Sequence, residues 1–339
     1  MRISLHRSHL SQTASAVMIP LLLSTSFAVA SRRPRATHAL PADAGLSLPP
    51  SLVAPASQST RTRDEALLTV EATVPLRLQS AAFPSQPVPG ALAYVPAGVD
   101  TGHPLHVVVF FHGWNGCAAA VASDEQIPCR PGGPRRGSLD LIGQFRASGR
   151  AAVLLIPQLG LETQRGDPGQ LGARDGLRRF LDESLTALAP QLGAHRVDEL
   201  ASVSVVAHSG GYEAAYAVLR QGGVEVQRVA FFDATYTGIP TLAGWLRPSL
   251  ENPFLDRRFV SVFGRGAAGA GSRQLQRLLR ADGHGGEVFL RSAPGRVTED
   301  DLRRPVSLLH SDGDHQQVLR RNLATVLRAM GLPAVPPAP

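Results

Sequence analysis

The stretch Val203–Tyr216, which reads VSVVAHSGGYEAAY, decides the fold of this chain. Its beginning is short, apolar and rich in valine, which predicts a strand that is buried on both faces of a sheet. After Gly211 the residues favour a helix. The segment between them, Ala207–Gly211, therefore has a strand–turn–helix context, in which a serine such as Ser209 is held on a sharp turn. The positions two before and two after this serine must be small, and they are, although Ala207 stands where glycine is more usual.

Predicted strands and helices alternate on both sides of this stretch. Alternating or apolar runs predict further strands at 67–78, 91–95, 105–111, 151–156, 226–232, 259–263, 287–290 and 305–309. Helical patterns are predicted at 174–192, 238–247, 272–281 and 316–330. This alternation implies right-handed crossovers and a mostly parallel sheet that is covered on both faces. Functional side chains of such a sheet lie at the carboxyl ends of its strands.

The carboxyl ends of the predicted strands carry groups that suit acyl-transfer chemistry. In chain order they are His112, Gly113, Ser209, Asp233, Phe263, Gly264 and His315. The order serine, acid, histidine is that of α/β-hydrolases. On these residues the chain resembles an α/β-hydrolase-fold serine hydrolase over most of residues 66–330, without a match to one subfamily. The resemblance implies an α/β-hydrolase fold, with a mostly parallel central sheet and helices on both faces.

Ser209 and His315 are the candidate nucleophile and base. A serine hydroxyl is a weak nucleophile at neutral pH, so a neighbouring base must take its proton. His315 lies in the loop after the last strand, where the resemblance places the catalytic histidine. His310, at the end of that strand, is the alternative base. His208, next to the serine, is expected to point away from it and to have a structural role.

Asp233 is the candidate acid, which would hold the imidazole in one tautomer and stabilise its cation. It ends the apolar strand that follows the serine. The resemblance places the acid more often after the next strand, but that strand ends without a carboxylate. Asp256, Asp312 and Asp314 remain alternatives.

Two backbone N–H groups are expected to form an oxyanion hole. Gly210 follows the nucleophile and should supply one of them. Trp114, in the loop after His112 and Gly113, should supply the other and also line the pocket.

Three loops above the strand ends, 114–137, 157–172 and 234–257, are expected to control substrate access. The third carries Tyr236, Trp245 and Phe254, which suit an aromatic binding wall or a small satellite core.

The N-terminus predicts a signal peptide over residues 1–30. A weakly basic start is followed by an apolar stretch that ends in Ala28-Val29-Ala30, a small-x-small cleavage pattern. We expect cleavage after Ala30 and a secreted or periplasmic protein, with an uncleaved anchor as the alternative. After cleavage no membrane span is expected. Residues 31–65 predict a disordered linker, residues 66–332 the folded domain, and residues 333–339 a Pro-rich tail.

The two cysteines, Cys117 and Cys129, are twelve positions apart in a loop rich in glycine and proline. In an oxidising compartment they are expected to form a disulfide, which contributes ~3 kcal/mol on the chain-entropy model. Two free thiols are the alternative. No set of cysteines and histidines has metal-ligand spacing, so no metal is expected.

Composition bounds the function further. The chain has 339 residues, of which 43% are hydrophobic, enough for a large core. More than half of its net charge of +7 lies in residues 1–65, and the remaining arginines are scattered. A domain so close to neutral is not expected to bind nucleic acid.

Together these patterns predict a secreted serine hydrolase that cleaves a carboxylic ester through an acyl-enzyme. Its substrate would be a small-molecule or polymeric ester, and the enzyme would be a monomer without a metal or organic cofactor. An amidase or peptidase that acts on cell-wall or peptide substrates is one alternative. A non-catalytic secreted binding protein with the same fold is the other, and the intact set of Ser209, Asp233 and His315 argues against it.

Overall fold

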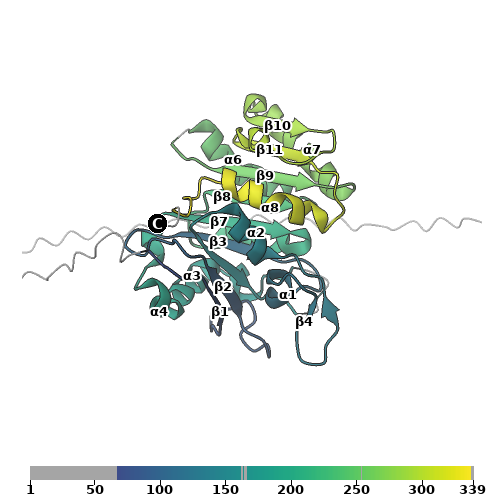
Figure 1. Cartoon of the computed structure of the whole chain (residues 1–339). Helices are drawn as coiled ribbons and strands as arrows, with labels where there is room; N and C mark the ends of the chain where they lie inside the picture. Colours follow the sequence, from purple (N-terminus) through teal and green to yellow (C-terminus); the bar gives the residue numbers. More distant parts are fainter. Residues whose placement is uncertain (1–66, 162, 164–165, 253, 337–339) are drawn as a thin grey trace, which may run out of the picture. The chain divides into compact units, whose positions relative to one another are not determined.

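The computed structural model describes residues 67–161, 163, 166–252 and 254–336 (Figure 1). The predicted signal peptide and linker lie outside these residues, as does the end of the Pro-rich tail. Within the described ranges, no helix has the length and apolar character that crossing a membrane requires.

One sheet organises the described part of the chain. Its nine strands have the order β1-β2-β6-β3-β7-β8-β9-β11-β10, which Figure 1 shows from β1 at the lower edge to β10 at the upper edge. The strands are β1 (Ala72–Leu76), β2 (Ala91–Val95), β3 (His106–Phe111), β6 (Val153–Pro157), β7 (Ser202–His208), β8 (Arg228–Phe232), β9 (Arg258–Phe263), β10 (Val288–Arg291) and β11 (Val306–His310). Strand β2 pairs antiparallel with β1 and β6, and the other pairings are parallel. The mostly parallel sheet is therefore confirmed.

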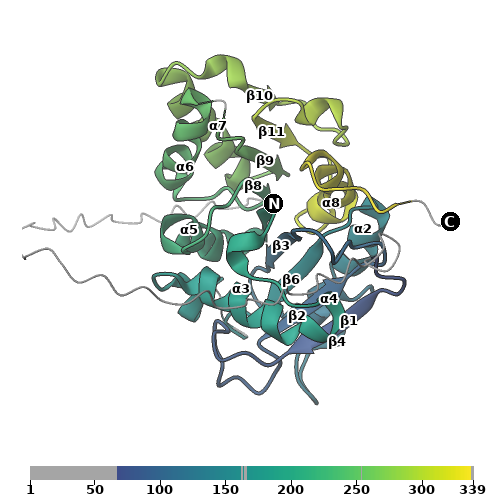
Figure 2. The same cartoon turned by 90° about the vertical axis from the view of Figure 1, so that its left-hand side faces the viewer.

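Helices cover both faces of this sheet. They are α1 (Ala118–Ala122), α2 (Leu141–Ser148), α3 (Gly176–Ala187), α4 (Ala189–Leu192), α5 (Tyr212–Gln221), α6 (Ile239–Glu251), α7 (Ala267–Ala281) and α8 (Gln317–Ala329). Helices α3, α5, α6 and α7 lie on one face, and α2 and α8 lie on the other (Figure 2). This arrangement confirms the predicted α/β-hydrolase fold.

Strand β3 shows why the central strands read as continuous apolar runs. Val107, Val109 and Phe111 pack into the core beneath α3 and α5, whereas Val108 and Phe110 pack into the core beneath α2 and α8. Successive side chains of a strand point to opposite faces. Because both faces are covered, no position along this strand favours a polar residue.

The helix predicted at 174–192 is interrupted. Helix α3 ends at Ala187, and a short helix, α4, begins at Ala189. Pro190 has no N–H to donate and cannot continue the hydrogen bonding of α3, but it fits the first turn of a new helix.

Two of the predicted loops contain regular structure. The segment 114–137 holds α1 and a hairpin of two short strands, β4 (Ile127–Pro128) and β5 (Arg135–Arg136). In the segment 234–257, the helix predicted at 238–247 is α6, which extends to Glu251. The hairpin and the helix therefore position side chains that a loop would leave unfixed.

Candidate active site

Ser209 occupies a strained turn at the carboxyl end of β7. A 3-10 turn over Ser209–Gly211 links β7 to α5. Ser209 has a φ of 53°, in the left-handed region that residues other than glycine rarely adopt. Gly211 packs so closely on the end of β3 that an added Cβ would collide with the carbonyl oxygen of Phe111. The requirement for a small residue after the serine therefore has a direct steric cause.

Asp233 and His315 form a hydrogen-bonded pair beside this turn. Asp233 follows β8 with a φ of 46°, and its N–H donates to the carbonyl oxygen of Val262 at 2.7 Å. Its Oδ2 accepts a hydrogen bond from His315 Nδ1 at 2.6 Å, and its Oδ1 accepts one from the N–H of Gly264 at 3.2 Å. Because an ionised carboxylate can only accept, Nδ1 carries the proton and Nε2 is left as the basic nitrogen.

Burial differs between the two partners of this pair. The Asp233 side chain is 9% exposed, whereas that of His315 is 45% exposed. The carboxylate is therefore buried in the protein interior, whereas the imidazole is open to solvent.

The alternative base, His310, is engaged elsewhere. Its Nδ1 donates to the carbonyl oxygen of Ser292 at 2.8 Å, and its ring stacks on Phe263 with centroids 5.5 Å apart. These contacts support His315 rather than His310 as the base.

The alternative acids are also engaged elsewhere. Asp312 pairs with Arg321 at 3.3 Å, and Asp314 accepts a hydrogen bond from the N–H of Gln317 at 2.8 Å, close to the start of α8. Asp256 pairs with two arginines near the amino ends of β8 and β9. Asp233 is thus the candidate carboxylate that the fold brings to His315.

His208 lies against His315. Its Nε2 donates to the carbonyl oxygen of His315 at 2.9 Å, and the two ring centroids are 4.7 Å apart. Burial lowers the pKa of His208 to about 4, so its ring is neutral at pH 7. His208 therefore supports the loop that carries His315.

The loop after β3 contacts the serine turn, as an oxyanion loop must. A Cβ on Gly113 would lie 2.6 Å from the Cβ of Ser209, and the indole of Trp114 covers Gly210. The N–H of Gly210 belongs to the start of the 3-10 turn, where N–H groups lack acceptors within the turn. Among the described residues none accepts a hydrogen bond from the N–H of Trp114.

His112 holds this loop in place through hydrogen bonds from the protein interior. It is 1% exposed, its Nδ1 donates to the carbonyl oxygen of Gly113 at 3.0 Å, and its Nε2 accepts from the N–H of Leu159 at 3.1 Å. Burial lowers its pKa to about 4, which keeps the ring neutral and Nε2 able to accept. His112 thus ties the oxyanion loop to the segment after β6.

Tyr236 is a site residue whose role the sequence left open. Its hydroxyl lies near the Ser209 side chain, and its ring packs on Tyr212 with centroids 5.6 Å apart. Burial raises the pKa of Tyr236 to about 12, so the phenol stays protonated at neutral pH. In the described part of the chain, the Ser209 hydroxyl forms no hydrogen bond with His315.

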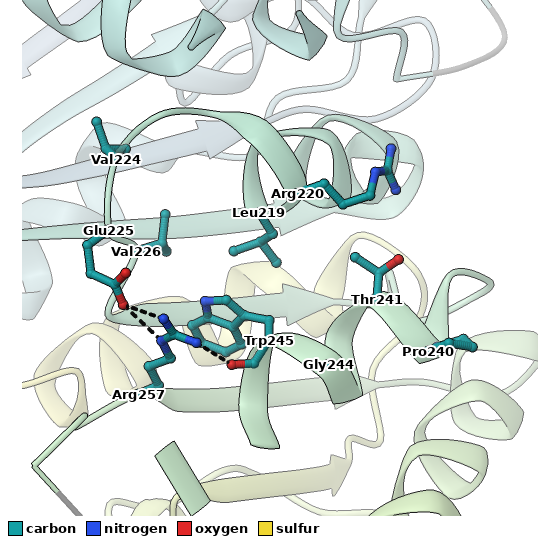
Figure 3. Close-up of a pocket in the computed structure, with 10 residues that line it drawn as sticks. All are labelled: Leu219, Arg220, Val224, Glu225, Val226, Pro240, Thr241, Gly244, Trp245 and Arg257. Carbon is teal, nitrogen blue, oxygen red and sulfur yellow. Dashed lines mark hydrogen bonds and ion pairs between the residues drawn. The ribbon is translucent and has the colours of Figure 1, made fainter. Parts of the chain in front are cut away.

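Trp245 and Phe254 do not join Tyr236 in an aromatic wall. Trp245 lines a separate cavity of ≈ 370 Å³ between α5 and α6, and the Arg257 guanidinium lies 5.6 Å from its ring centroid. Figure 3 shows Trp245 beside Arg257 among the residues that line this cavity. This cavity lies near the amino end of β8, whereas Ser209 lies at the carboxyl end of β7. Phe254 is 93% exposed. Helix α6 causes the difference, because it carries Trp245 away from the strand ends.

A second cavity, of ≈ 390 Å³, opens directly onto Ser209 and His315. Trp114 and His208 line it, together with Arg135 and other residues of the β4–β5 hairpin. Its volume is at the lower end of the range for small-molecule sites.

The predicted disulfide is present beside this cavity. Cys117 and Cys129 are bonded, with their Cα atoms 5.8 Å apart. Cys117 immediately precedes α1, and Cys129 immediately follows β4. The bond therefore joins the end of the oxyanion loop to the hairpin.

Comparisons with known proteins give similarities to solved structures. No protein-family model and no curated protein matches the chain. A mutant of the feruloyl esterase module from Clostridium thermocellum, in complex with sinapinate, is 12% identical with a TM-score of 0.48, and the match covers 78% of this chain and 88% of that one. S-formylglutathione hydrolase from Staphylococcus aureus is 10% identical with a TM-score of 0.44, covering 77% of this chain and 98% of that one. Identities this low carry no information on substrate or mechanism.

Proposed function

We propose that the chain is a serine hydrolase that cleaves carboxylic esters, with Ser209 as nucleophile, His315 as general base and Asp233 as the orienting acid. The observation that carries the proposal is the 2.6 Å hydrogen bond between His315 Nδ1 and Asp233 Oδ2, at the edge of a cavity that also contains Ser209. This pair leaves Nε2 of the imidazole as the one nitrogen able to take a proton.

Acylation begins when the Ser209 hydroxyl forms a hydrogen bond with Nε2 of His315. Catalytic hydrogen bonds often form only once substrate is bound. As Nε2 takes the proton, Oγ attacks the ester carbonyl carbon, and the carbonyl oxygen becomes an oxyanion. The N–H groups of Gly210 and Trp114 donate to this oxyanion. The intermediate then collapses, the bond to the alcohol oxygen breaks, and His315 protonates the departing alcohol.

Deacylation repeats these steps with water as the nucleophile. Nε2 of His315 takes a proton from water as the water oxygen adds to the acyl carbon. The second intermediate then collapses, the bond to Oγ of Ser209 breaks, and His315 returns the proton to Oγ as the carboxylic acid leaves. In both halves the Asp233 carboxylate stabilises the imidazolium. Because Asp233 is 9% exposed, its charge is less screened than that of a surface carboxylate.

An ester is the proposed substrate because an alcohol leaves a tetrahedral intermediate more readily than an amine does. Amide hydrolysis would use the same residues, so matched ester and amide substrates of one acyl group separate the two activities. We expect a kcat/KM for the ester that exceeds that for the amide.

Labelling with a fluorophosphonate tests the nucleophile. The wild-type protein and Ser249→Ala, a control on α6, should be labelled at Ser209, whereas folded Ser209→Ala should not be labelled. Removal of a catalytic serine of this kind lowers kcat by about 10⁶-fold, so ester hydrolysis should be lost as well. Labelling at a different serine, or full activity of Ser209→Ala, would refute the assignment.

We also propose that the protein is exported. The Cys117–Cys129 disulfide supports this proposal, because such bonds persist in oxidising compartments. Mass spectrometry of the protein from the periplasm or medium should find an N-terminus at Ser31, and accumulation of the uncleaved chain in the cytosol would contradict export.

A further inference from the structure

We propose that the cavity over Ser209 selects esters that carry a carboxylate at a distance from the reacting carbonyl, and that Arg135 binds this carboxylate. The inference deepens the proposed ester hydrolysis and rests on it for the position of the ester group. Suitable substrates are half-esters of dicarboxylic acids and acyl esters of hydroxy acids.

The charge of the cavity is the first support. Arg135 and Arg136 of β5 line the same cavity as Ser209 and His315, and none of the described residues that line it is an aspartate or a glutamate. His208, the other imidazole in the lining, is neutral at pH 7 because burial lowers its pKa. Arg136 already has a partner, so the positive charge offered to a substrate in this cavity is that of Arg135.

The availability of the Arg135 guanidinium is the second support. It is exposed and, in the part of the chain that the structure describes, makes no side-chain hydrogen bond or ion pair. By contrast, Arg291 is held in a 2.6 Å pair with Asp301. A guanidinium presents its donors in a rigid fork that matches a carboxylate. Arg135 can therefore accept a carboxylate without first breaking an ion pair.

The covalent frame of the hairpin is the third support. Arg135 pairs with Pro128 in the two-stranded β4–β5 ladder, and Cys129, the next residue after Pro128, is bonded to Cys117. Cys117 lies three positions after Trp114 in the loop that contacts Ser209. The disulfide thus limits how far Arg135 can move relative to the nucleophile, which lowers the cost of ordering the site when substrate binds.

Trp114 provides the surface between the two ends of such a substrate. It lines the cavity, its indole covers Gly210, and it is 60% exposed. With the ester carbonyl at Ser209 and the carboxylate at Arg135, the apolar middle of the substrate would contact this indole. This contact would explain why Trp114 is exposed when no substrate is bound.

A matched pair of esters tests the proposal. The anionic substrate is 4-acetoxybenzoate, and the neutral substrate is its methyl ester. The measured quantity is the ratio of their kcat/KM values, in the wild type, in Arg135→Gln and in Arg277→Gln. Arg277 is an exposed arginine on α7, so its variant removes the same charge far from the cavity.

We expect the ratio to fall by about tenfold in Arg135→Gln, mainly through KM for the anionic ester, as suits a partly exposed charge-assisted hydrogen bond. The ratio should stay at the wild-type value in Arg277→Gln. It should also fall more steeply with salt in the wild type than in Arg135→Gln, because the Debye length shrinks from roughly 30 Å at 0.01 M to roughly 3 Å at 1 M. An unchanged ratio in Arg135→Gln, or an equal fall in Arg277→Gln, would overturn the proposal.

A binding measurement separates this proposal from the proposed hydrolysis. Calorimetry with 4-acetamidobenzoate, which has an amide in place of the ester, should show about tenfold weaker binding to Arg135→Gln than to the wild type. Its methyl ester is the neutral control. If the wild type cleaves neither ester but binding depends on Arg135, the proposed hydrolysis fails and the anion site stands. If cleavage occurs and neither binding nor the ratio depends on Arg135, the anion site fails and the hydrolysis stands.

Discussion

Replacement of Asp233 by asparagine changes one atom of the site and reverses a hydrogen bond. In the wild type Oδ1 accepts from the N–H of Gly264 and Oδ2 accepts from His315 Nδ1. The asparagine oxygen must keep the Gly264 contact, because a backbone N–H can only donate. Its NH₂ group then faces His315 and donates to Nδ1. This forces the proton onto Nε2, and the imidazole can no longer take the proton of Ser209.

The magnitude follows from the geometry of the pair. The imidazolium formed during the reaction lies 2.6 Å from the carboxylate, measured from Nδ1 to Oδ2. At an effective dielectric constant of about 20, Coulomb's law gives about 6 kcal/mol of attraction at that distance. Because His315 is 45% exposed, solvent screens part of this attraction. We expect the variant to lose about 5.5 kcal/mol of transition-state stabilisation, or about 10⁴-fold in kcat.

The assay is steady-state hydrolysis of 4-nitrophenyl acetate, with circular dichroism to show that each variant is folded. Asp312→Asn is the matched control, because Asp312 is close to His315 in sequence but pairs with Arg321. Its kcat should stay within about twofold of the wild type, as expected for a surface ion pair. A folded Asp233→Asn variant with near-normal kcat, or an equal loss in Asp312→Asn, would refute the role given to Asp233.

Two further predictions concern the packing of the oxyanion loop and the pH dependence of stability. Gly113→Ala places a Cβ 2.6 Å from the Cβ of Ser209. We therefore expect kcat/KM for the same ester to fall by about 10²-fold or more and the free energy of unfolding to fall by about 1–3 kcal/mol. The control is Gly244→Ala, whose Cβ meets nothing within 4 Å, and equal behaviour of the two variants would count against contact between the loop and the serine turn. Burial lowers the pKa of His112 and His208 from 6.5 to about 4. At pH values between these two, the unfolded chain binds protons at these histidines that the folded chain does not bind. The free energy of unfolding should therefore fall as the pH decreases from 6.5 to about 4. Urea denaturation at several pH values measures this fall, which should be less steep in His208→Phe; a free energy of unfolding that is flat or rises on acidification would contradict it.

The fold could be predicted from the sequence because its signals are local. The apolar residues of β7, the glycines after Ser209 and the helical pattern of α5 are contiguous in the chain, and each acts through its own backbone preference or through burial. Functional side chains of a parallel sheet lie at the carboxyl ends of its strands, so only a few positions were candidates, and these included Asp233 and His315. The interruption of the helix at Pro190 was also visible locally but was outweighed by the apolar periodicity around it.

Only the tertiary structure determines which charged and polar groups contact one another. Asp233 and His315 are 82 positions apart, and His208 reaches a carbonyl 107 positions away, so no sequence spacing indicates either contact. The choice among the four candidate carboxylates required knowing that the other three already have partners.

The surroundings of the site were likewise decided by three-dimensional packing. Helix α6 carries Trp245 away from Ser209, while Tyr236, just before that helix, stays beside it. A short hairpin with no strong sequence signal brings Arg135 to the cavity. The sequence alone determined which backbone elements form, because backbone preference and burial are properties of neighbouring residues. The partners of each side chain depend on how those elements pack, which only the folded chain determines.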